Sequence, residues 1–277
     1  MSLFTKDSED LIIDLDLDNS TGYTQSTVNS ASINNKGVEA ILNVIPVQSR
    51  DFTWDVTASF SLLRSEVISI ADGIDQIYVG GYVGRGNIAI PGLPYGILEG
   101  ELIRRDYGSL DGTDHTQVHW DDRTGYTPIV NANGGYQFLG YGVIGNPQPD
   151  YVYGVTNTLS YKWATLRVQF DSQVGGDVFS TTNSTLLGRG ILQETDFDRF
   201  VPVVTNGLSA DGTPNTTQTT ANAHYWPNTG VFYDENSIYD ASVMRLREVS
   251  LSFVAPKSFL NGTPCLLYTS PSPRDRG

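Results

Sequence analysis

Residues Phe52–Ser65, FTWDVTASFSLLRS, indicate the fold class because apolar and polar side chains alternate over about a dozen positions. One face of this segment is apolar and carries Phe52, Trp54, Val56, Ala58, Phe60 and Leu62. The opposite face is polar, with Leu63 as the exception, and carries Thr53, Asp55, Thr57, Ser59 and Ser61. A period of two is the pattern of a β-strand that is apolar on one face.

The same alternation recurs along the chain and predicts further strands. These segments are Leu11–Leu17, Gly37–Pro46, Asp150–Ser160, Thr165–Gly175 and Ser242–Val254. The last segment changes phase near Arg245–Glu248, so we expect a β-bulge or a change of environment there. Shorter strands are expected inside Ile97–Tyr107 and Tyr136–Val143.

Strand length and loop length together favour an antiparallel transmembrane β-barrel. Strands average about 5–6 residues in soluble proteins, whereas a strand that crosses a membrane needs about 9–11. Two connections, Gln48–Asp51 and Tyr161–Ala164, are tight reversals, whereas Ser65–Pro149 and Gly176–Tyr239 are long and polar. Short turns at one end and long loops at the other are typical of outer-membrane barrels. A soluble β-sandwich produces the same alternation with its apolar face inside, so the pattern alone leaves that alternative open.

Composition excludes several classes of protein. The net charge is −14, with 31 acidic and 17 basic residues, which argues against a nucleic-acid partner. The single cysteine excludes an internal disulfide framework and a cysteine-based zinc site. No apolar run reaches the ~20 residues of a membrane-spanning helix, and the first residues, MSLFTKDSEDL, lack the apolar stretch of a signal peptide. If the protein is exported, this chain does not carry the export signal itself, so we expect it to be a piece of a longer protein.

Four stretches, in this order, resemble the C-terminal part of SusC/RagA-type TonB-linked outer-membrane transporters. Ile33–Gly73 resembles the family's N-K-G-V-E strand and the F-x-W hairpin partner that follows it. Ile144–Asn157, IGNPQPDYVYGVTN, resembles its G-N-P-x-P-D motif at the start of a strand. The short DGTPNT at Asp211–Thr216 is a further match, and Tyr239–Pro256 resembles the D-A-S-x-x-R-L-R-x-V-x-L strand. The matches span nearly all of Leu11–Pro256.

This resemblance implies a function in nutrient import across the cell outer membrane. The family forms a barrel of about 22 strands that is plugged by an N-terminal domain. It imports oligosaccharides or peptides with energy from an inner-membrane TonB complex, and a SusD-like surface lipoprotein usually caps the barrel. Residues 1–264 would then be a partial barrel in contact with outer-membrane lipid, with long extracellular loops, and the plug and the final strands would lie outside this chain.

The last residues, Cys265–Gly277 (CLLYTSPSPRDRG), differ from the remainder of the chain. The run CLLYTSPSPRD resembles the translation of a transposase adapter that is used in sequencing libraries. We therefore expect residues 265–277 to be a non-native tail, with a disordered Ser/Pro tail as the alternative.

Aromatic residues in the predicted loops are the candidates for contact with a ligand or a partner protein. They are Trp120, Tyr126, Tyr225 and Trp226, with Tyr136 and Tyr141 as further members of the group. Aromatic faces stack on the apolar faces of sugars, and loops carry most binding residues. Trp120 stands beside the hydrogen-bonding run Asp121–Arg123. The alternative for each ring is that it packs one loop against another.

No residues are nominated as catalytic, cofactor-binding or metal-binding. Asp14, Asp16 and Asp18 resemble the start of a calcium loop, but Asn19 and Gln25 replace its glycine and glutamate. His115 and His119 lack the glutamate of the metalloprotease motif and the helical pattern around it. The acidic neighbours Asp121–Asp122 and Glu194–Asp196 match what chance gives in an acidic chain. Two alternatives to a transporter are a secreted β-sandwich adhesin or carbohydrate-binding module and part of a β-rich glycosidase.

Overall fold

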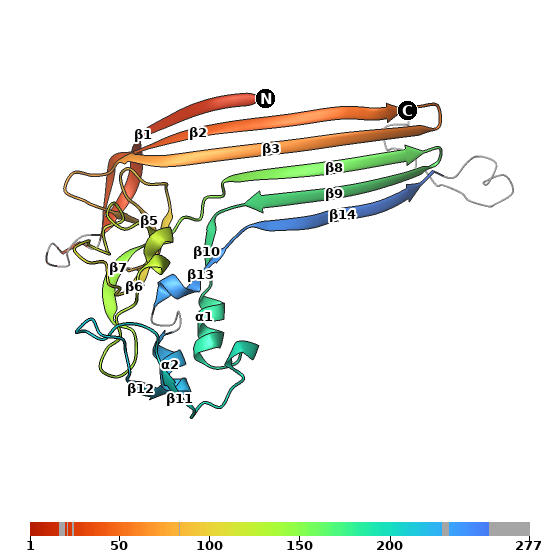
Figure 1. Cartoon of the computed structure of the whole chain (residues 1–277). Coiled ribbons are helices and arrows are strands. Elements are labelled where there is room, and N and C mark those ends of the chain that lie inside the picture. Colours follow the sequence, from red (N-terminus) through yellow and green to blue (C-terminus); the bar gives the residue numbers. More distant parts are fainter. Residues whose placement is uncertain (17–19, 21, 24, 83, 229–232, 255–277) are drawn as a thin grey trace. The chain divides into compact units, whose positions relative to one another are not determined.

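The computed structural model describes residues 1–16, 20, 22–23, 25–82, 84–228 and 233–254. Within these residues the long strands form one antiparallel six-stranded sheet in the order β1-β2-β3-β8-β9-β14 (Figure 1). These strands are β1 (Ser2–Asp16), β2 (Gln25–Gln48), β3 (Phe52–Ser69), β8 (Tyr151–Tyr161), β9 (Ala164–Val174) and β14 (Val243–Phe253). Each overlaps one of the six segments that alternate in the sequence, although β1 and β2 begin earlier than expected, so the prediction of an all-β, antiparallel fold is confirmed.

Both tight reversals that the sequence predicts are present. The turn between β2 and β3 closes where the Ser49 backbone N–H donates to the Phe52 carbonyl oxygen at 2.8 Å. The turn between β8 and β9 contains Lys162 with a φ of +53°, in the left-handed region. Its backbone N–H donates to the carbonyl oxygen of Asp51 at 2.9 Å, which joins the two turns.

Strand β2 begins earlier than the sequence pattern predicts. The alternation starts at Gly37, but the strand starts at Gln25 and has 24 residues. Its first half pairs with β1, from Ser2 opposite Glu39 to Asp16 opposite Gln25, with irregular register around Leu11. This half carries only scattered apolar residues, of which Ala31 is buried, so it leaves no clear hydrophobic period in the sequence.

The expected change of phase in β14 is confirmed by the side-chain contacts of the strand. Arg245 and Arg247 both bind Asp171 of β9. Glu248 binds Arg167 of β9, with 3.2 Å between the Arg167 Nε and the Glu248 carboxylate. Asp171 and Arg167 lie four positions apart on one face of β9, so the consecutive residues 247 and 248 reach the same face. The apolar positions shift accordingly, and are Met244 and Leu246 before the break and Val249, Leu251 and Phe253 after it.

The buried core of the described residues lies mainly in the two long connections, and the long strands contribute little to it. Residues between β3 and β8 form a second sheet in the order β4-β5-β6-β7. Its strands are β4 (Ile77–Tyr82), β5 (Arg85–Ala89), β6 (Ile97–Ile103) and β7 (Phe138–Gly145). Two adjacent clusters fill it, namely Ile88, Ile97 and Val143, and Leu98, Leu102 and Ile144. Both short strands expected in this region are present, but they belong to this smaller sheet.

The second long connection mixes short strands and helices. Strand β10 (Asp177–Phe179) pairs with β13 (Ile238–Asp240), and β11 (Pro202–Val204) pairs with β12 (Gln218–Thr220). Ser180 accepts a hydrogen bond from the Asn183 backbone N–H and so caps helix α1. The helices of the two connections are η2 (Trp120–Gly125), α1 (Thr181–Gly188), η3 (Gln193–Thr195), α2 (Ala221–Asn228) and η4 (Asp234–Ser237).

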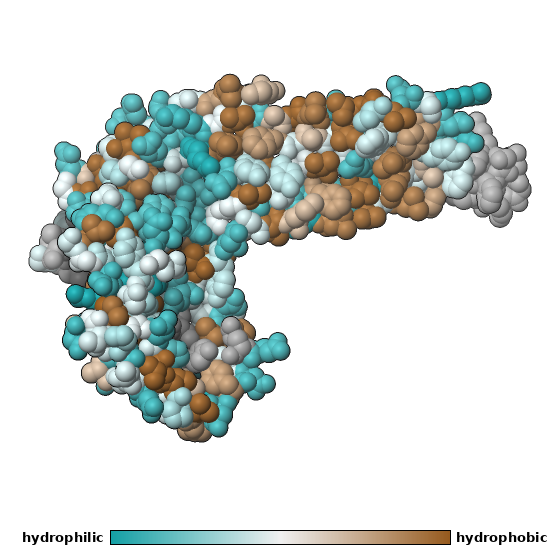
Figure 2. All heavy atoms as spheres, in the orientation of Figure 1, coloured by the Kyte–Doolittle hydropathy of each residue, from teal (hydrophilic) through white to brown (hydrophobic). Residues whose placement is uncertain are grey.

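The apolar side chains of the long strands do not form an enclosed core. Figure 2 shows hydrophobic residues gathered over these strands. On β14 the exposed fractions are 65% for Met244, 62% for Val249 and 58% for Leu251. None of the residues that a sandwich would bury is in the buried core of the described chain; these are Trp54, Phe60, Val168 and Phe170. None of the described helices has the length and apolar character needed to cross a bilayer. Residues 265–277 lie outside the described residues, so their assignment as a tail stays a prediction.

Candidate functional site

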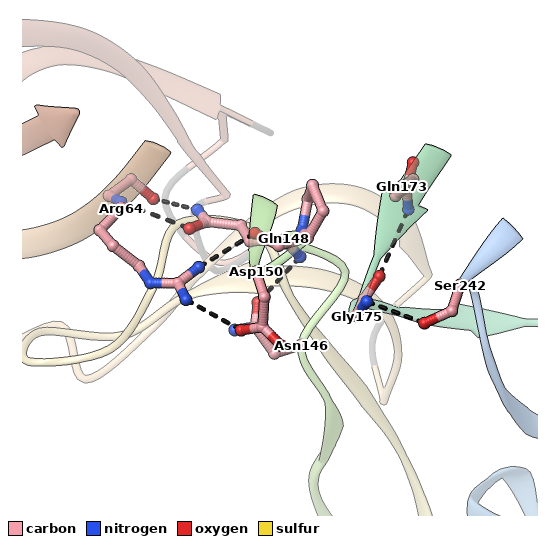
Figure 3. A network of polar contacts seen from close by, with 9 residues as sticks. Arg64, Asn146, Gln148, Asp150, Gln173, Gly175 and Ser242 are labelled. Atoms are coloured by element: carbon pink, nitrogen blue, oxygen red, sulfur yellow. Dashed lines mark hydrogen bonds and ion pairs between the residues drawn. The ribbon is translucent and has the colours of Figure 1, made fainter. Parts of the chain in front are cut away.

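The segment Asn146–Asp150, NPQPD, leads from β7 into β8 and is the centre of a polar network (Figure 3). Arg64 of β3 donates to an Asp150 carboxylate oxygen at 2.8 Å and to the preceding carbonyl oxygen at 3.0 Å. The Gln148 side-chain oxygen accepts from the Ser65 backbone N–H at 3.3 Å. The motif that the sequence analysis identified therefore attaches the end of β3 to the start of β8.

The turn after β9 packs directly on this motif and requires glycine. Gly175 and Gly176 have φ values of +73° and +85°. A Cβ atom on Gly175 would lie 2.5 Å from the Asp150 carboxylate, and one on Gly176 would lie 2.9 Å from the Pro147 carbonyl oxygen. The Gly175 backbone N–H also donates to the Ser242 hydroxyl at 2.8 Å, just before β14 (Figure 3). This turn thus connects β9 and β14 to the same network.

Asp177, the first residue of β10, is fixed by two hydrogen bonds with Asn146. The Asn146 backbone N–H donates to the Asp177 carboxylate at 2.7 Å, and the Asp177 N–H donates to the Asn146 carbonyl oxygen at 2.8 Å. Burial raises the pKa of the Asp177 carboxyl group, while the Asn146 hydrogen bond opposes that shift. The network therefore positions a half-buried carboxyl group beside the end of β7.

A buried ion pair joins the two long connections. An Arg105 Nη2 atom lies 2.6 Å from a Glu235 carboxylate oxygen, and each side chain is only 9% exposed. Arg105 also donates to the Tyr126 carbonyl oxygen at 3.3 Å. Burial raises the pKa of Glu235, and the charge of Arg105 opposes that shift. Among the described residues, the Arg105 Nε and the second Glu235 oxygen have no hydrogen-bond partner.

Arg123 of η2 is a second buried cation. The residue is 2% exposed, and its guanidinium donates to the carbonyl oxygens of Val143 and Gly112. Its Nε has no hydrogen-bond partner, and it forms no ion pair within the described part of the chain. Burial disfavours the charged guanidinium and so lowers the pKa of Arg123. A buried guanidinium with an unused donor is costly for the fold.

These groups line one cavity of about 230 Å³, which we name the Trp120 cavity. Its charged wall includes Arg105, Arg123, Asp177 and Glu235. Its apolar wall consists of Trp120, Ile144 and Ile238.

A larger cavity of about 410 Å³, the Phe179 cavity, shares the wall residues Ile144 and Asp177 with the first. It combines the apolar Leu98 and Phe179 with the polar Asn87 and Glu99. Glu99 is buried and accepts hydrogen bonds from the Tyr78 hydroxyl at 2.7 Å and from Gln76 at 2.9 Å. The two cavities therefore lie side by side, with Asp177 between them.

The four predicted site residues lie in three different surroundings: Trp120 in a cavity wall, Tyr126 against another ring, and Tyr225 and Trp226 in α2. Trp120 lines the cavity with Asp121 and Arg123, and its indole stacks on His119 with 3.8 Å between ring centroids. The Tyr126 ring contacts Tyr107 edge-on at 4.9 Å. Tyr225 and Trp226 lie in α2, and their side chains are outside the described residues. The further aromatic residues contact other rings, Tyr136 with Tyr233 and Tyr141 with Phe138.

Sequence reasoning missed Arg105 and Glu235. They are separated by 130 positions and belong to no motif, so only the packing of the two connections brings them together. Arg123 follows Trp120, Asp121 and Asp122, which the sequence indicated as candidates. Apart from its charge, nothing in the sequence indicates that its side chain is buried against a strand.

The metal and catalytic candidates gain no geometric support. The described residues contain no group of three or more His, Cys, Asp and Glu side chains that could hold a metal ion. His119 instead caps η2 by accepting from the Asp121 backbone N–H at 3.3 Å. The side chains of Asp14, Asp16 and Glu194 lie outside the described residues, as does all of Asp18.

The known proteins that this chain resembles are TonB-dependent receptors and a peptide transporter. No family profile matches the chain. TonB-dependent receptor P3 of Formosa agariphila is 25% identical over 94% of the chain, which corresponds to 25% of that receptor. TonB-dependent receptor SusC of Bacteroides thetaiotaomicron is 22% identical over 90% of the chain and 23% of its own length. A solved structure of the RagAB peptide transporter matches 94% of the chain with a TM-score of 0.62 and 18% identity, over 27% of its own length.

The chain thus spans about a quarter of the relatives that it matches. The resemblance to SusC/RagA-type TonB-linked transporters, and to part of their fold, is confirmed. The relatives are receptors and transporters, which is a non-enzymatic class of protein.

Proposed function

We propose that this relative of TonB-dependent receptors forms part of the wall and the extracellular region of a SusC/RagA-type importer in the outer membrane. The observation that carries the proposal is the six-stranded sheet of long strands, in which five apolar side chains of β14, from Met244 to Phe253, are 58–65% exposed. A soluble protein buries such a face, whereas a membrane barrel presents it to acyl chains.

Backbone hydrogen bonding supports the same conclusion. In hydrocarbon each backbone donor and acceptor must be paired within the protein, and a sheet satisfies this only by closing into a barrel. The polar face of such a wall meets water or a plug domain and can carry ion pairs such as Asp171 with Arg245 and Arg247. Further strands of the longer protein would complete the closure, and its N-terminal part would contact the TonB complex.

The long connections would form the surface that meets the ligand first. We propose that the ligand is an oligosaccharide or a peptide, that a SusD-like surface lipoprotein assists its capture, and that the chain has no catalytic role. Trp120, in the wall of a cavity between the two connections, is the ligand-contacting residue that the geometry favours among the four candidates.

Membrane extraction tests this function. The longer receptor that carries this segment should remain in the membrane after washing with alkaline carbonate and should dissolve only in detergent. Deletion of its gene should abolish uptake of its ligand. Recovery of the protein in the carbonate wash, or of a folded 277-residue chain that stays in solution without detergent, would favour the adhesin instead.

A further inference from the structure

We infer that two short turns at one end of the wall bind the phosphate group of a membrane phospholipid. They are residues 49–52, between β2 and β3, and residues 161–164, between β8 and β9. Short turns of an outer-membrane barrel lie on the periplasmic side, so this lipid belongs to the inner leaflet. Arg50 and Lys162 are the residues that contact the phosphate. The inference rests on the proposed membrane wall and names what one rim of that wall binds.

The two turns are held together by a backbone hydrogen bond. The Lys162 N–H donates to the Asp51 carbonyl oxygen at 2.9 Å, so the tips of the two hairpins are adjacent (Figure 1). Within the first turn, the Ser49 hydroxyl accepts from the Phe52 N–H at 3.1 Å. Because Asp51 directly follows Arg50, the long side chains of Arg50 and Lys162 start from neighbouring tips. One phosphate group can therefore contact both cations.

The joined turns carry more positive than negative charge. The Lys162 Nζ atom lies 3.8 Å from an Asp51 carboxylate oxygen, and these side chains are 48% and 54% exposed. Arg50 is exposed and takes part in none of the ion pairs between described residues. Two cations and one anion leave a positive surface in a chain whose net charge is −14. A guanidinium presents parallel N–H donors to phosphate oxygens, so a phosphate group complements this surface.

Exposed aromatic rings lie directly beside the cations. The centroids of the Trp163 and Phe253 rings are 5.5 Å apart, and the two residues are 51% and 59% exposed. Tyr161 is 54% exposed, and the Lys162 Nζ atom lies 5.3 Å from the centroid of its ring. Tryptophan and tyrosine prefer the boundary between acyl chains and headgroups, and long basic side chains extend from that level towards the phosphates. The rings therefore place the two cations at the depth of the headgroups.

The apolar surface of the wall continues up to these turns. Phe253 follows Val249 and Leu251 on the exposed apolar face of β14. The next residue, Val254, donates its N–H to the Trp163 carbonyl oxygen at 2.7 Å. A phospholipid covers such a surface with its acyl chains while its phosphate reaches the cations. A soluble periplasmic protein would contact the turns alone and leave the rings exposed, so the lipid matches more of this surface.

Binding is measured on the longer receptor, made free of cysteine and purified in an uncharged detergent. Bimane on Gln48→Cys reports on the first turn, because Gln48 is exposed and lies two positions before Arg50. The probes are dioleoyl phosphatidylglycerol, dioleoylglycerol, which has the same acyl chains and no phosphate, and inorganic phosphate. We expect a saturable change of bimane emission with phosphatidylglycerol that weakens at high salt. Dioleoylglycerol lacks the phosphate and inorganic phosphate lacks the acyl chains, so neither should cause this change.

Variants that remove charge assign the response to the two cations. Arg50→Gln and Lys162→Gln should each weaken phosphatidylglycerol binding about fivefold, and the double variant should weaken it about 25-fold. Lys6→Gln combined with Arg189→Gln is the matched control, because it removes the same charge from two exposed residues outside the turns. This control should bind like the unmodified receptor. All four side chains are exposed, so the melting temperatures should stay unchanged.

Four results would overturn the inference. The first is an equal response to dioleoylglycerol, which would mean apolar contact alone. The second is phosphatidylglycerol binding that the double variant leaves unchanged, and the third is no response from a receptor that melts normally. The fourth is saturation by inorganic phosphate alone, which would mean an anion site without lipid.

The outcome is separable from that of the proposed function. A receptor that resists carbonate extraction but gives one of these four results would refute this inference and leave the import function intact. Release of the receptor by carbonate would refute the membrane wall itself.

Discussion

Replacement of Leu251 in β14 by arginine tests which medium contacts the apolar face of the sheet. Leu251 is 58% exposed, and in a membrane wall it would contact acyl chains. An arginine on the lipid face costs about 2–4 kcal/mol near the bilayer midplane, which is roughly 30- to 700-fold in the folding equilibrium. Ser250 lies on the opposite face and donates to Glu248 at 2.6 Å. Ser250→Arg should therefore change the equilibrium by less than threefold, or about 0.6 kcal/mol.

Urea titration of the longer receptor in lipid vesicles, followed by tryptophan fluorescence, measures both variants. A cysteine scan over residues 244–253 of a cysteine-free receptor, with an environment-sensitive fluorophore as the label, shows which positions face an apolar medium. Apolar emission is expected at positions 244 and 246, then at 249, 251 and 253, with the phase change after residue 247. Equal effects of the two arginines, or emission that alternates without interruption through Arg247 and Glu248, would refute the reasoning.

Three further perturbations follow from contacts in the long connections. Gly175→Ala should reduce the free energy of unfolding, measured by urea titration, by about 1–3 kcal/mol more than Gly212→Ala does. Both glycines have a positive φ, but only at Gly175 would the added Cβ have atoms within 4 Å. Equal losses in the two variants would contradict this. Arg123→Met should lower stability by about 1–3 kcal/mol because the Val143 carbonyl oxygen loses its donor, and an unchanged melting temperature would count against that role. Burial lowers the pKa of His224, so the unfolded chain takes up the proton first and the stability contributed by this residue is complete above pH ~6.5 and falls below it. The protection factors of the α2 amides, which correct for the slower intrinsic exchange in acid, should fall as the pH drops below about 6.5, and His224→Asn should remove that dependence.

The wall strands could be predicted because burial on one face leaves a period of two in the sequence. Phe52–Ser65 and Thr165–Gly175 illustrate this, and even the phase change at Arg247 is visible. The first half of β2, from Gln25, could not be predicted, because its apolar residues Val28, Ala31 and Ile33 are scattered and do not alternate regularly with polar ones. Helices α1 and α2 were also missed, since each has only eight residues and neither carries a clear apolar stripe.

The site was only partly predictable. Trp120 attracted attention because an aromatic residue stood beside hydrogen-bonding neighbours in a loop. The contact between Arg105 and Glu235 depends on how two connections fold against each other, and no local pattern encodes a pairing across 130 positions. Tyr126 looked equivalent to Trp120 in the sequence, yet its ring packs on Tyr107. Composition identifies aromatic residues in loops, but packing decides which of them line a cavity.

The hydrophobic clusters inside the connection between β3 and β8 have a consequence for divergence among related receptors. Because Ile88, Ile97 and Val143 pack with one another, substitutions on the surface of this connection need not disturb the pairing of the long strands. Natural selection can therefore alter what such a receptor recognises while keeping its frame. An engineer who grafts this connection onto a related frame should move the second long connection with it, because the buried pair Arg105 and Glu235 joins the two.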